Sequence, residues 1–332
     1  MPLRRILTTA ADRGTLGGLM WKRIVGGAVA LGLGAGLTVA ADNDTEPAWL
    51  KLAVTPPPEA PAVEHELTLT ETVVGGSDIH RGPTSYGQLS ENHLDFSYVA
   101  GVPLREGWQL RAGVAYERYD FGSLRGAVLP NRLGVAALVL GLDVNLSEQW
   151  LLRVEVRPGV YGEFSRVTMD QVNVPLILGA TYLVNADWQW FLGVQVDPHF
   201  GTGIYHWDDV PVMPGAGLRW RFADRWTLLA MLPNPEVQYE VMDGLQVYVG
   251  ARMNGGNFRT DKNSGRGKLA NANLSYYEIR VGAGARYALA PGLSLEAEGG
   301  SAVTRQFYYS GADMQFHTDP AWYAQVRFSM EF

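Results

Sequence analysis

The chain of 332 residues contains no cysteine, which excludes a disulfide framework, a thiolate metal site and a cysteine nucleophile. Charged residues are scarce, at 18% of the chain, and the formal net charge is -7. A general nucleic-acid-binding protein is therefore not expected, because an acidic chain does not attract phosphates. Tryptophan and tyrosine, by contrast, are abundant, with 10 and 15 residues. Few charges together with many such rings are typical of a protein with aromatic belts at a membrane interface.

Long apolar runs are also missing after residue 64, where no stretch reaches the roughly 18 residues of a transmembrane helix. Apolar and polar residues alternate instead, over 108–116, 150–157, 245–253, 277–287 and 322–332. A period of two predicts strands with one apolar and one polar face. Water-soluble sandwiches and barrels share this alternation, but here the polar faces are rich in glycine, tyrosine and glutamine, with charges of both signs interspersed.

The N-terminal segment has the features of an export signal. Residues 1–23 carry five Lys and Arg residues against one acid, and an apolar, glycine-rich run over 24–39 leads to small residues. This order predicts a cleaved signal peptide over 1–41, with Met20 as a possible true start. An uncleaved anchor helix is the alternative. Residues 42–63, rich in proline and alanine, are expected to form a periplasmic linker before a barrel domain over 64–332.

Tryptophan marks a repeat in that domain. A polar turn, a tryptophan and an alternating strand recur at Trp108, Trp150, Trp188 and Trp226, with spacings of 42, 38 and 38 residues. Short turns on this side and longer loops on the other predict a transmembrane, antiparallel up-and-down β-barrel. The four tryptophans would form its periplasmic aromatic girdle. The longer loops are expected near 75–91, 120–131, 162–171, 198–211, 256–271 and 309–320.

The spacing predicts fourteen strands in this all-β barrel, an even number that leaves both ends of the barrel domain in the periplasm. Twelve strands are the alternative, because one pair is short. The segments 225–232 and 235–241, on either side of Asn234, fall below the about 9–11 residues that a tilted strand needs to span a bilayer.

The C-terminal segment WYAQVRFSMEF has apolar residues at every second position back from Phe332. It resembles the C-terminal strand of Gram-negative outer-membrane barrels, which the barrel-assembly machinery recognises. The resemblance implies an assembly signal at Phe328, Met330 and Phe332. It also implies the cell outer membrane as the location, with outer-membrane lipid and the assembly machinery as partners.

A second resemblance lies in the middle of the chain, where MLPNPEVQYE is followed by GLQVYVGARMNGGNFR. These segments resemble an uncharacterised family of bacterial outer-membrane β-barrel proteins, classed as a domain of unknown function. The similarity covers roughly 65–332, in a pattern LPxPxxxY…YxGA…GGxxR. The residues that carry it are Pro233, Pro235, Tyr239, Tyr248, Gly250, Gly255, Gly256 and Arg259. The family implies an outer-membrane location but brings no activity and no site residues.

The alternation also predicts which charges face the lumen, because a charge facing lipid costs about 2–4 kcal/mol at mid-bilayer. These residues are Arg111, Glu117, Arg153, Glu155, Arg157, Arg252, Glu278, Arg280, Arg286, Glu296, Glu298, Arg327 and Glu331. Their signs are mixed, so no ion selectivity is predicted. Roughly eight strands give a filled interior, so a wider barrel favours a porin-like passive channel for small solutes of unknown identity. A salt-bridged lumen that conducts little is the alternative.

Other roles compete with the channel. The segment 255–269 is a candidate plug, although a surface loop is the simpler interpretation. A non-conducting barrel would bind a surface partner through loop aromatics, with Trp207 and Tyr308–Tyr309 as candidates. An outer-membrane hydrolase needs a base oriented by a carboxylate at the outer rim.

The candidates for such a base, or for a metal site, are His199, His206, Asp208 and Asp209, with His317 and Asp319 in the last loop. The first of these loops contains no serine, so no catalytic residue, metal or cofactor is assigned. The remaining histidines are expected to be turn or strand-end residues: His65, His80 and His93.

Overall fold

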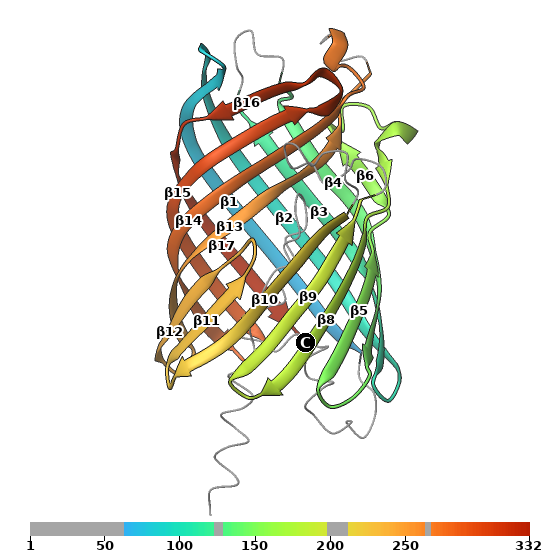
Figure 1. The fold of residues 1–332 in the computed structure, drawn as a ribbon, viewed down its shortest axis with the longest axis vertical. Coiled ribbons are helices and arrows are strands. Elements are labelled where there is room, and N and C mark those ends of the chain that lie inside the picture. Colours follow the sequence, from blue (N-terminus) through green and yellow to red (C-terminus); the bar gives the residue numbers. More distant parts are fainter. Residues whose placement is uncertain (1–62, 123–128, 198–211, 263–266) are drawn as a thin grey trace, which may run out of the picture.

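Fourteen strands form one closed, antiparallel β-barrel in the computed structural model, which describes residues 63–122, 129–197, 212–262 and 267–332 (Figure 1). Each strand pairs with the next along the chain, and the first strand pairs with the last. This closing seam runs from Glu66 opposite Glu331 to Val74 opposite Tyr323. Closure leaves the described part of the sheet without a free edge, as a lipid environment requires.

Eleven strands are continuous and three are interrupted. The continuous strands are β1 (Glu64–Arg81), β2 (Thr84–Arg105), β3 (Trp108–Phe121), β4 (Arg132–Asn145), β9 (Trp188–Val196), β10 (Val212–Ala223), β11 (Trp226–Met231), β12 (Glu236–Met242), β13 (Leu245–Arg259), β14 (Asn273–Ala290) and β15 (Leu293–Tyr309). The interrupted strands are β5 (Trp150–Val156) with β6 (Gly159–Gly162), β7 (Val172–Asn173) with β8 (Leu176–Asn185), and β16 (Met314–Thr318) with β17 (Ala321–Glu331). Each interruption contains a proline, which has no N–H to donate to the ladder: Pro158, Pro175 and Pro320.

Short 3-10 helices lie between some strands: η1 (Met169–Gln171), η2 (Gly267–Leu269) and η3 (Ser310–Ala312). Within the described ranges, no helix is long and apolar enough to cross a membrane.

The prediction of fourteen strands is confirmed, including its shortest hairpin. β11 and β12 have only six and seven residues. They nevertheless pair with each other, and their outer neighbours β10 and β13 continue the sheet on both sides. The twelve-strand alternative is therefore wrong.

Two of the predicted loops are wrong because the strands continue beyond the expected span. β1 and β2 extend through most of 75–91 and meet in a tight turn at 82–83. The register shifts between Val74 and Ser77, where two glycines interrupt the alternation that would have revealed the strand. The segment 309–320 holds η3 and β16, and β16 pairs with both β1 and β15. One side of the barrel is therefore taller at the loop end (Figure 1).

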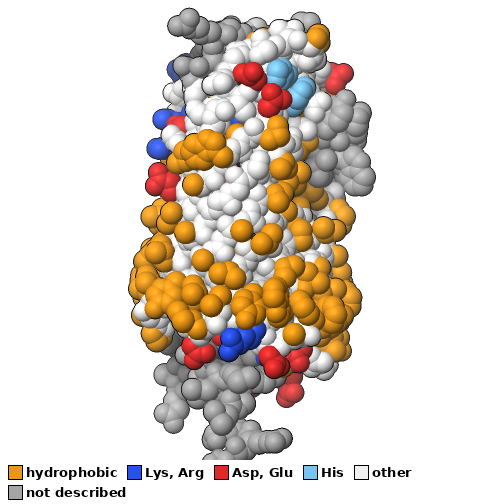
Figure 2. All heavy atoms as spheres, turned by 90° about the vertical axis from the view of Figure 1, so that its left-hand side faces the viewer, with side chains coloured by type: hydrophobic (Ala, Val, Ile, Leu, Met, Phe, Trp, Pro, Cys, Tyr) orange, Lys and Arg blue, Asp and Glu red, His pale blue; other side chains and the backbone are white. Residues whose placement is uncertain are grey.

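The outward face carries an apolar band that lies nearer the short-turn end, where β2 turns into β3 (Figure 2). Large apolar side chains on this face are between 44% and 60% exposed: Leu138, Leu140, Val154, Leu192 and Val249. The tryptophans predicted to form a girdle are each the first residue of a strand at this end: Trp108, Trp150, Trp188 and Trp226. Three of them lie 4.7–5.3 Å, between ring centroids, from a ring on the neighbouring strand: Tyr182, Trp220 and Tyr239.

The C-terminal residues close the short-turn end of the seam. Phe332 exchanges two backbone hydrogen bonds with His65, at 2.9 and 3.0 Å, and its ring stacks on the imidazole. Phe328 and Met330 alternate with the buried Arg327 and Ser329 and so share the outward face of β17.

The position of the apolar band yields a stability prediction. The variant Leu138→Arg places a charge on the outward face of β4, where Leu138 is 52% exposed. It is expected to lower the free energy of unfolding in phospholipid vesicles by about 2–4 kcal/mol, because the charge would face lipid. Urea unfolding followed by tryptophan fluorescence measures this change. Val167→Arg is the matched control, since Val167 is 58% exposed between β6 and η1, outside the strands, and a change within about 0.5 kcal/mol is expected there. Equal effects of the two variants would contradict a lipid-covered band.

Candidate functional site

The interior of the barrel changes character along its length. On β3, the inward side chains run from Arg111 near the short-turn end through Glu117 to Tyr119 and Phe121 at the loop end. β14 and β15 show the same gradient, with charged side chains at mid-height and aromatic side chains toward the loop end. The lumen therefore has a charged middle section followed by an apolar section.

Arg280 on β14 connects strands that are not neighbours in the wall. Its guanidinium forms an ion pair with Glu278 on its own strand and lies 3.5 Å from Glu91 on β2. It also donates a hydrogen bond of 3.1 Å to the hydroxyl of Thr72 on β1. Three strands separate β14 from β2 in the sheet, so the contact with Glu91 crosses the lumen. All four side chains are buried.

A second group of charges surrounds Glu296 and Glu298 on β15. Arg252 Nε lies 2.9 Å from Glu298, and Arg252 Nη2 lies 3.2 Å from Glu296. Glu296 is also 2.5 Å from Arg286 and 3.5 Å from Arg327. Arg252 Nη2 also lies 3.3 Å from Glu236 on β12. Three arginines thus share three carboxylates on the inward faces of β12, β13, β14, β15 and β17.

Two tyrosines reach the same carboxylates across glycines. The Tyr248 hydroxyl donates to Glu298 at 2.7 Å, and the Tyr323 hydroxyl donates to the other oxygen of Glu298. A Cβ at Gly284 would overlap the Tyr248 hydroxyl, and a Cβ at Gly282 would overlap the Tyr323 hydroxyl. These two inward positions on β14 therefore need glycine for the rings to cross a neighbouring strand.

A third group lies nearer the short-turn end. Arg111 binds both oxygens of Glu66, at 3.1 and 3.0 Å, and Arg153 binds both oxygens of Asp143, at 2.8 Å each. Paired hydrogen bonds of this kind are the strong form of arginine–carboxylate contact. Glu155 lies 3.9 Å from Arg111 and 2.7 Å from Arg157. We call the three groups together the charge network, with the members Glu66, Glu91, Arg111, Asp143, Arg153, Glu155, Arg157, Glu236, Arg252, Glu278, Arg280, Arg286, Glu296, Glu298 and Arg327.

The apolar section at the loop end is packed by aromatic rings. We call it the loop-end cluster, with the members Ile79, Leu89, Tyr119, Phe121, Leu129, Leu133, Val135, Ala137, Tyr161, Phe258, Leu269, Leu274, Tyr276, Phe307, Tyr309 and Phe316. Ring centroids of Tyr276 and Phe307 are 4.7 Å apart, and those of Phe121 and Phe307 are 5.1 Å apart. The hydroxyls of Tyr119 and Tyr276 donate to Glu117 and Glu91. The two sections of the lumen are thereby connected.

Chain segments beyond the strands complete this cluster. Leu129, from the β3–β4 connection, and Leu269, from η2, are 6% and 3% exposed. The Thr260 hydroxyl donates to the Leu269 carbonyl at 2.7 Å, which folds the segment back on itself. Of the candidate plug over 255–269, residues 255–259 belong to β13, whereas Leu269 packs into the lumen. Residues 263–266 lie outside the described part of the chain.

Most of the thirteen predicted lumen residues are buried. Those with side chains fully inside are Arg111, Glu117, Glu155, Glu278, Arg280, Arg286, Glu296, Glu298 and Arg327. Those that are half-buried are Arg153, Arg157, Arg252 and Glu331. The structure brings all of them except Glu117 and Glu331 into the charge network, and Glu117 contacts it through His93.

Sequence reasoning missed several members of this interior. Asp143 follows the alternation of β4 and carried a usable signal. Glu91 was missed because it falls in the segment predicted as a loop. Arg305 is buried and donates hydrogen bonds to Ser77 and Leu89. It was missed because the register of β15 shifts opposite Arg280, so that Arg305 faces inward where unbroken alternation would place it outward.

The histidine predictions hold only in part. His65 and His80 lie near the two ends of β1. The prediction for His93 is wrong, because it is buried within β2 and its Nε2 lies 3.0 Å from Glu117. Burial of His93 is possible because the buried carboxylate of Glu117 is its partner, and sequence periodicity alone does not reveal this contact.

The candidate loop sites are only partly described. The aromatics Tyr308 and Tyr309, considered as loop residues, are the last two residues of β15 and are buried. The candidates for a base or a surface contact at His199, His206, Trp207, Asp208 and Asp209 lie outside the described residues. His317 lies on β16, with Asp319 just after it, on the outer surface of the rim.

Residues 105–331 match a protein family described as a domain of unknown function (DUF6268). The chain belongs to this family. The match covers β3 to β17, which make up twelve of the fourteen strands, and it begins after β1 and β2 rather than near residue 65 as expected. No curated protein matches the chain significantly. The fold of this DUF6268 protein is a closed, antiparallel β-barrel of fourteen strands.

Several solved structures are similar to the DUF6268 chain at low sequence identity. The toluene transporter TodX of Pseudomonas putida is 12% identical, with a TM-score of 0.44 and coverage of 85% of this chain and 92% of that chain. An outer membrane channel from Pseudomonas putida F1 is 12% identical, with a TM-score of 0.43 and coverage of 84% and 100%. A FadL homologue of Pseudomonas aeruginosa is 10% identical, with a TM-score of 0.37 and coverage of 81% and 89%.

The burial of the charge network yields a second stability prediction. Arg280→Met removes the guanidinium between Glu278 and Glu91 and is expected to cost about 3–5 kcal/mol, because buried carboxylates lose their counter-charge. Urea unfolding of the refolded barrel measures the loss, and adding Glu278→Gln is expected to restore part of it. Arg132→Met is the control, since the Arg132–Asp120 pair is exposed and such pairs contribute about 0–1 kcal/mol. Equal costs would contradict a network that stabilises the wall.

Proposed function

We propose that the chain is a passive channel of the outer membrane for small solutes, with a lumen of mixed charge that narrows at the loop-end cluster. The proposal rests on the order of charged and apolar side chains along the lumen. A charged section lies across the middle of the fourteen-strand wall, and an apolar section follows at one end. The role is transport and includes no enzymatic step.

The cost of the charge network supports a passage rather than a filled core. Four of its arginines are buried: Arg111, Arg280, Arg286 and Arg327. Apolar side chains of similar volume commonly fill a closed space at equal or lower free energy. Ionisable residues at membrane depth mark pathways more often than structural supports. A row of both signs would orient a solute's dipole as it passes.

The width of the wall supports the same proposal. Roughly eight strands give an interior that side chains fill, and this barrel has fourteen. Its loop end is filled by the aromatic and aliphatic side chains of the loop-end cluster, including Leu129 and Leu269. Side chains change rotamer far more readily than a wall changes diameter. We infer that the loop-end cluster is the constriction, and that it favours small solutes with an apolar part.

A second candidate is a structural barrel that does not conduct. The observation that favours it is the pairing of charges. Each arginine of the charge network forms an ion pair with at least one carboxylate, and paired charges need no solute. Conductance separates the two roles.

The proposed constriction predicts a gain of conductance. In planar bilayers, the refolded mature chain is expected to give uniform single-channel steps, and Phe258→Ala combined with Phe307→Ala is expected to enlarge them about two-fold or more, because both rings are fully buried in the loop-end cluster. Val249→Ala, on the outward face of β13 and 60% exposed, is the control and should leave the step unchanged. A folded wild type and a folded double variant that both stay silent would overturn the channel and favour the structural role.

The proposed polar section predicts opposite shifts in ion preference. Arg252→Ala removes a positive charge beside Glu296 and Glu298 and should move the reversal potential under a salt gradient toward cations. Glu298→Gln should move it toward anions, because the arginines then prevail. Arg132→Ala, which is exposed on the outward side, should move neither. Identical reversal potentials in all four proteins would show that the ions do not pass the charge network.

A further inference from the structure

Four ligand-type side chains lie together on the outer surface of the rim, where β1 meets β16. His80 is directly opposite His317 in the antiparallel register, and the Asp319 amide donates a hydrogen bond of 2.9 Å to the Asp78 carbonyl. The two histidines therefore form one cross-strand pair, and the two aspartates form the next pair on the same face of the sheet. The intervening Ile79 and Thr318 are buried, so all four neighbours project outward. We call Asp78, His80, His317 and Asp319 the rim cluster.

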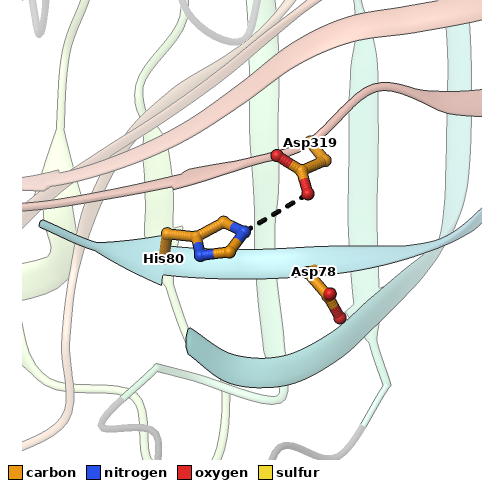
Figure 3. Close-up of side chains that lie close together, drawn as sticks. All are labelled: Asp78, His80 and Asp319. Carbon is orange, nitrogen blue, oxygen red and sulfur yellow. Dashed lines mark hydrogen bonds and ion pairs between the residues drawn. The ribbon is translucent and has the colours of Figure 1, made fainter. Parts of the chain in front are cut away.

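The side chains converge as well as the backbones. His80 Nε2 lies 3.3 Å from Asp319 Oδ2, and one ligand atom each of Asp78, His80 and Asp319 lies within 4.8 Å of the others (Figure 3). The ring centroids of His80 and His317 are 5.8 Å apart. Figure 2 shows histidine and acidic side chains together near the upper end, above the apolar band.

The arrangement is costly without a cation. Like charges directly opposite each other on an antiparallel pair destabilise it, and Asp78 with Asp319 is such a pair. The hydrogen bond between His80 and Asp319 compensates the charge of Asp319, but the carboxylate of Asp78 still lies next to it. A surface ion pair of His80 and Asp319 needs no Asp78 at this position, whereas a metal ion uses both carboxylates.

The backbone beneath the rim cluster is held in place from inside. The Arg305 guanidinium donates to Ser77 Oγ at 2.6 Å and to Thr318 Oγ1 at 3.3 Å. These two residues immediately adjoin Asp78 on β1, and His317 and Asp319 on the other strand. One buried arginine thus fixes the relative position of both strands, which is the support that a pre-formed ligand set requires.

We propose that the rim cluster binds one late first-row divalent metal ion, with Zn²⁺ as the test ion. The ligands are an imidazole nitrogen of His80 and carboxylate oxygens of Asp78 and Asp319, and the His317 ring stacks on the His80 ring beside them. Imidazole and carboxylate together suit Zn²⁺ or Cu²⁺, which have a preference for nitrogen that Mg²⁺ and Ca²⁺ lack. His80 and Asp319 are 25% and 60% exposed, so the ion reaches them from solvent.

The ion would connect the first strand to the last. β1 and the β16–β17 strand form the seam that closes the barrel, and the rim cluster lies at its loop end. Because the ligands come from both sides of the seam, the folded barrel alone brings them together. Metal binding then stabilises the closed barrel by mass action. This inference is independent of whether the barrel conducts.

The test is titration of the tag-free, refolded mature chain with ZnCl₂ by calorimetry after removal of metal with EDTA. One ion per barrel is expected. His80→Gln, Asp319→Asn and Asp78→Asn are each expected to weaken the Kd about 10-fold or more, since even outer-shell partners of a metal contribute 10–100-fold. The controls are His65→Gln, at the other end of β1, and His206→Gln, in a segment with its own histidines and aspartates; both should bind as the wild type does.

A second measurement separates a metal site from a simple ion pair. In EDTA, Asp78→Asn should leave the thermal midpoint unchanged or raise it, because it removes the repulsion with Asp319, whereas Zn²⁺ should raise the midpoint of the wild type more than that of Asp78→Asn. Absence of Zn²⁺ binding by the wild type would overturn the proposal. Binding that survives in His80→Gln but is lost in His206→Gln would overturn it as well, and so would equal Zn²⁺ effects on Asp78→Asn and the wild type.

Discussion

Pairing of the first strand with the last is the contact on which the rest of this structure depends. A bilayer offers the backbone no hydrogen-bonding partner, so a sheet placed there must satisfy its own N–H and C=O groups. The seam from Glu66–Glu331 to Val74–Tyr323 does this by giving β1 and β17 each a second neighbour. Once the sheet is closed, its two faces meet different environments. Over the apolar band the apolar side chains turn outward, and the charged side chains of the strands lie in the lumen.

The enclosed charges are arranged by contacts between distant strands. Arg280 contacts Glu91 across the lumen, and the Tyr276 hydroxyl on the same strand donates to the same carboxylate. These contacts connect β14 to β2, which are not neighbours in the sheet. The wall is therefore braced from within. The loop-end cluster continues this bracing with apolar packing, and the tyrosines belong to both sections, with rings in one and hydroxyls in the other.

The sequence was informative wherever the period of two was unbroken. It predicted the fourteen strands, the first residue of four of them at a tryptophan, and the side of the wall on which Arg111 or Glu296 lies. It failed where the register shifts. The glycines after Val74 and the shift in β15 beside Ala302 reverse the alternation, which concealed the tall β1–β2 hairpin and the inward position of Arg305. The rim cluster was beyond reach for another reason: His80 and His317 become neighbours only through a register between segments 237 residues apart.

That same separation determines when the barrel can form. Glu66 pairs with Glu331, so the seam cannot close until the last residues of the chain are available. Before that point, β1 exposes an edge that is open to pairing with any other strand. Contacts this distant in sequence form slowly, because loop-closure entropy is lost before they stabilise the chain. The closed barrel therefore forms only after residues up to Glu331 have been synthesised, and a chain that lacks β17 is a hazard for aggregation rather than a smaller barrel.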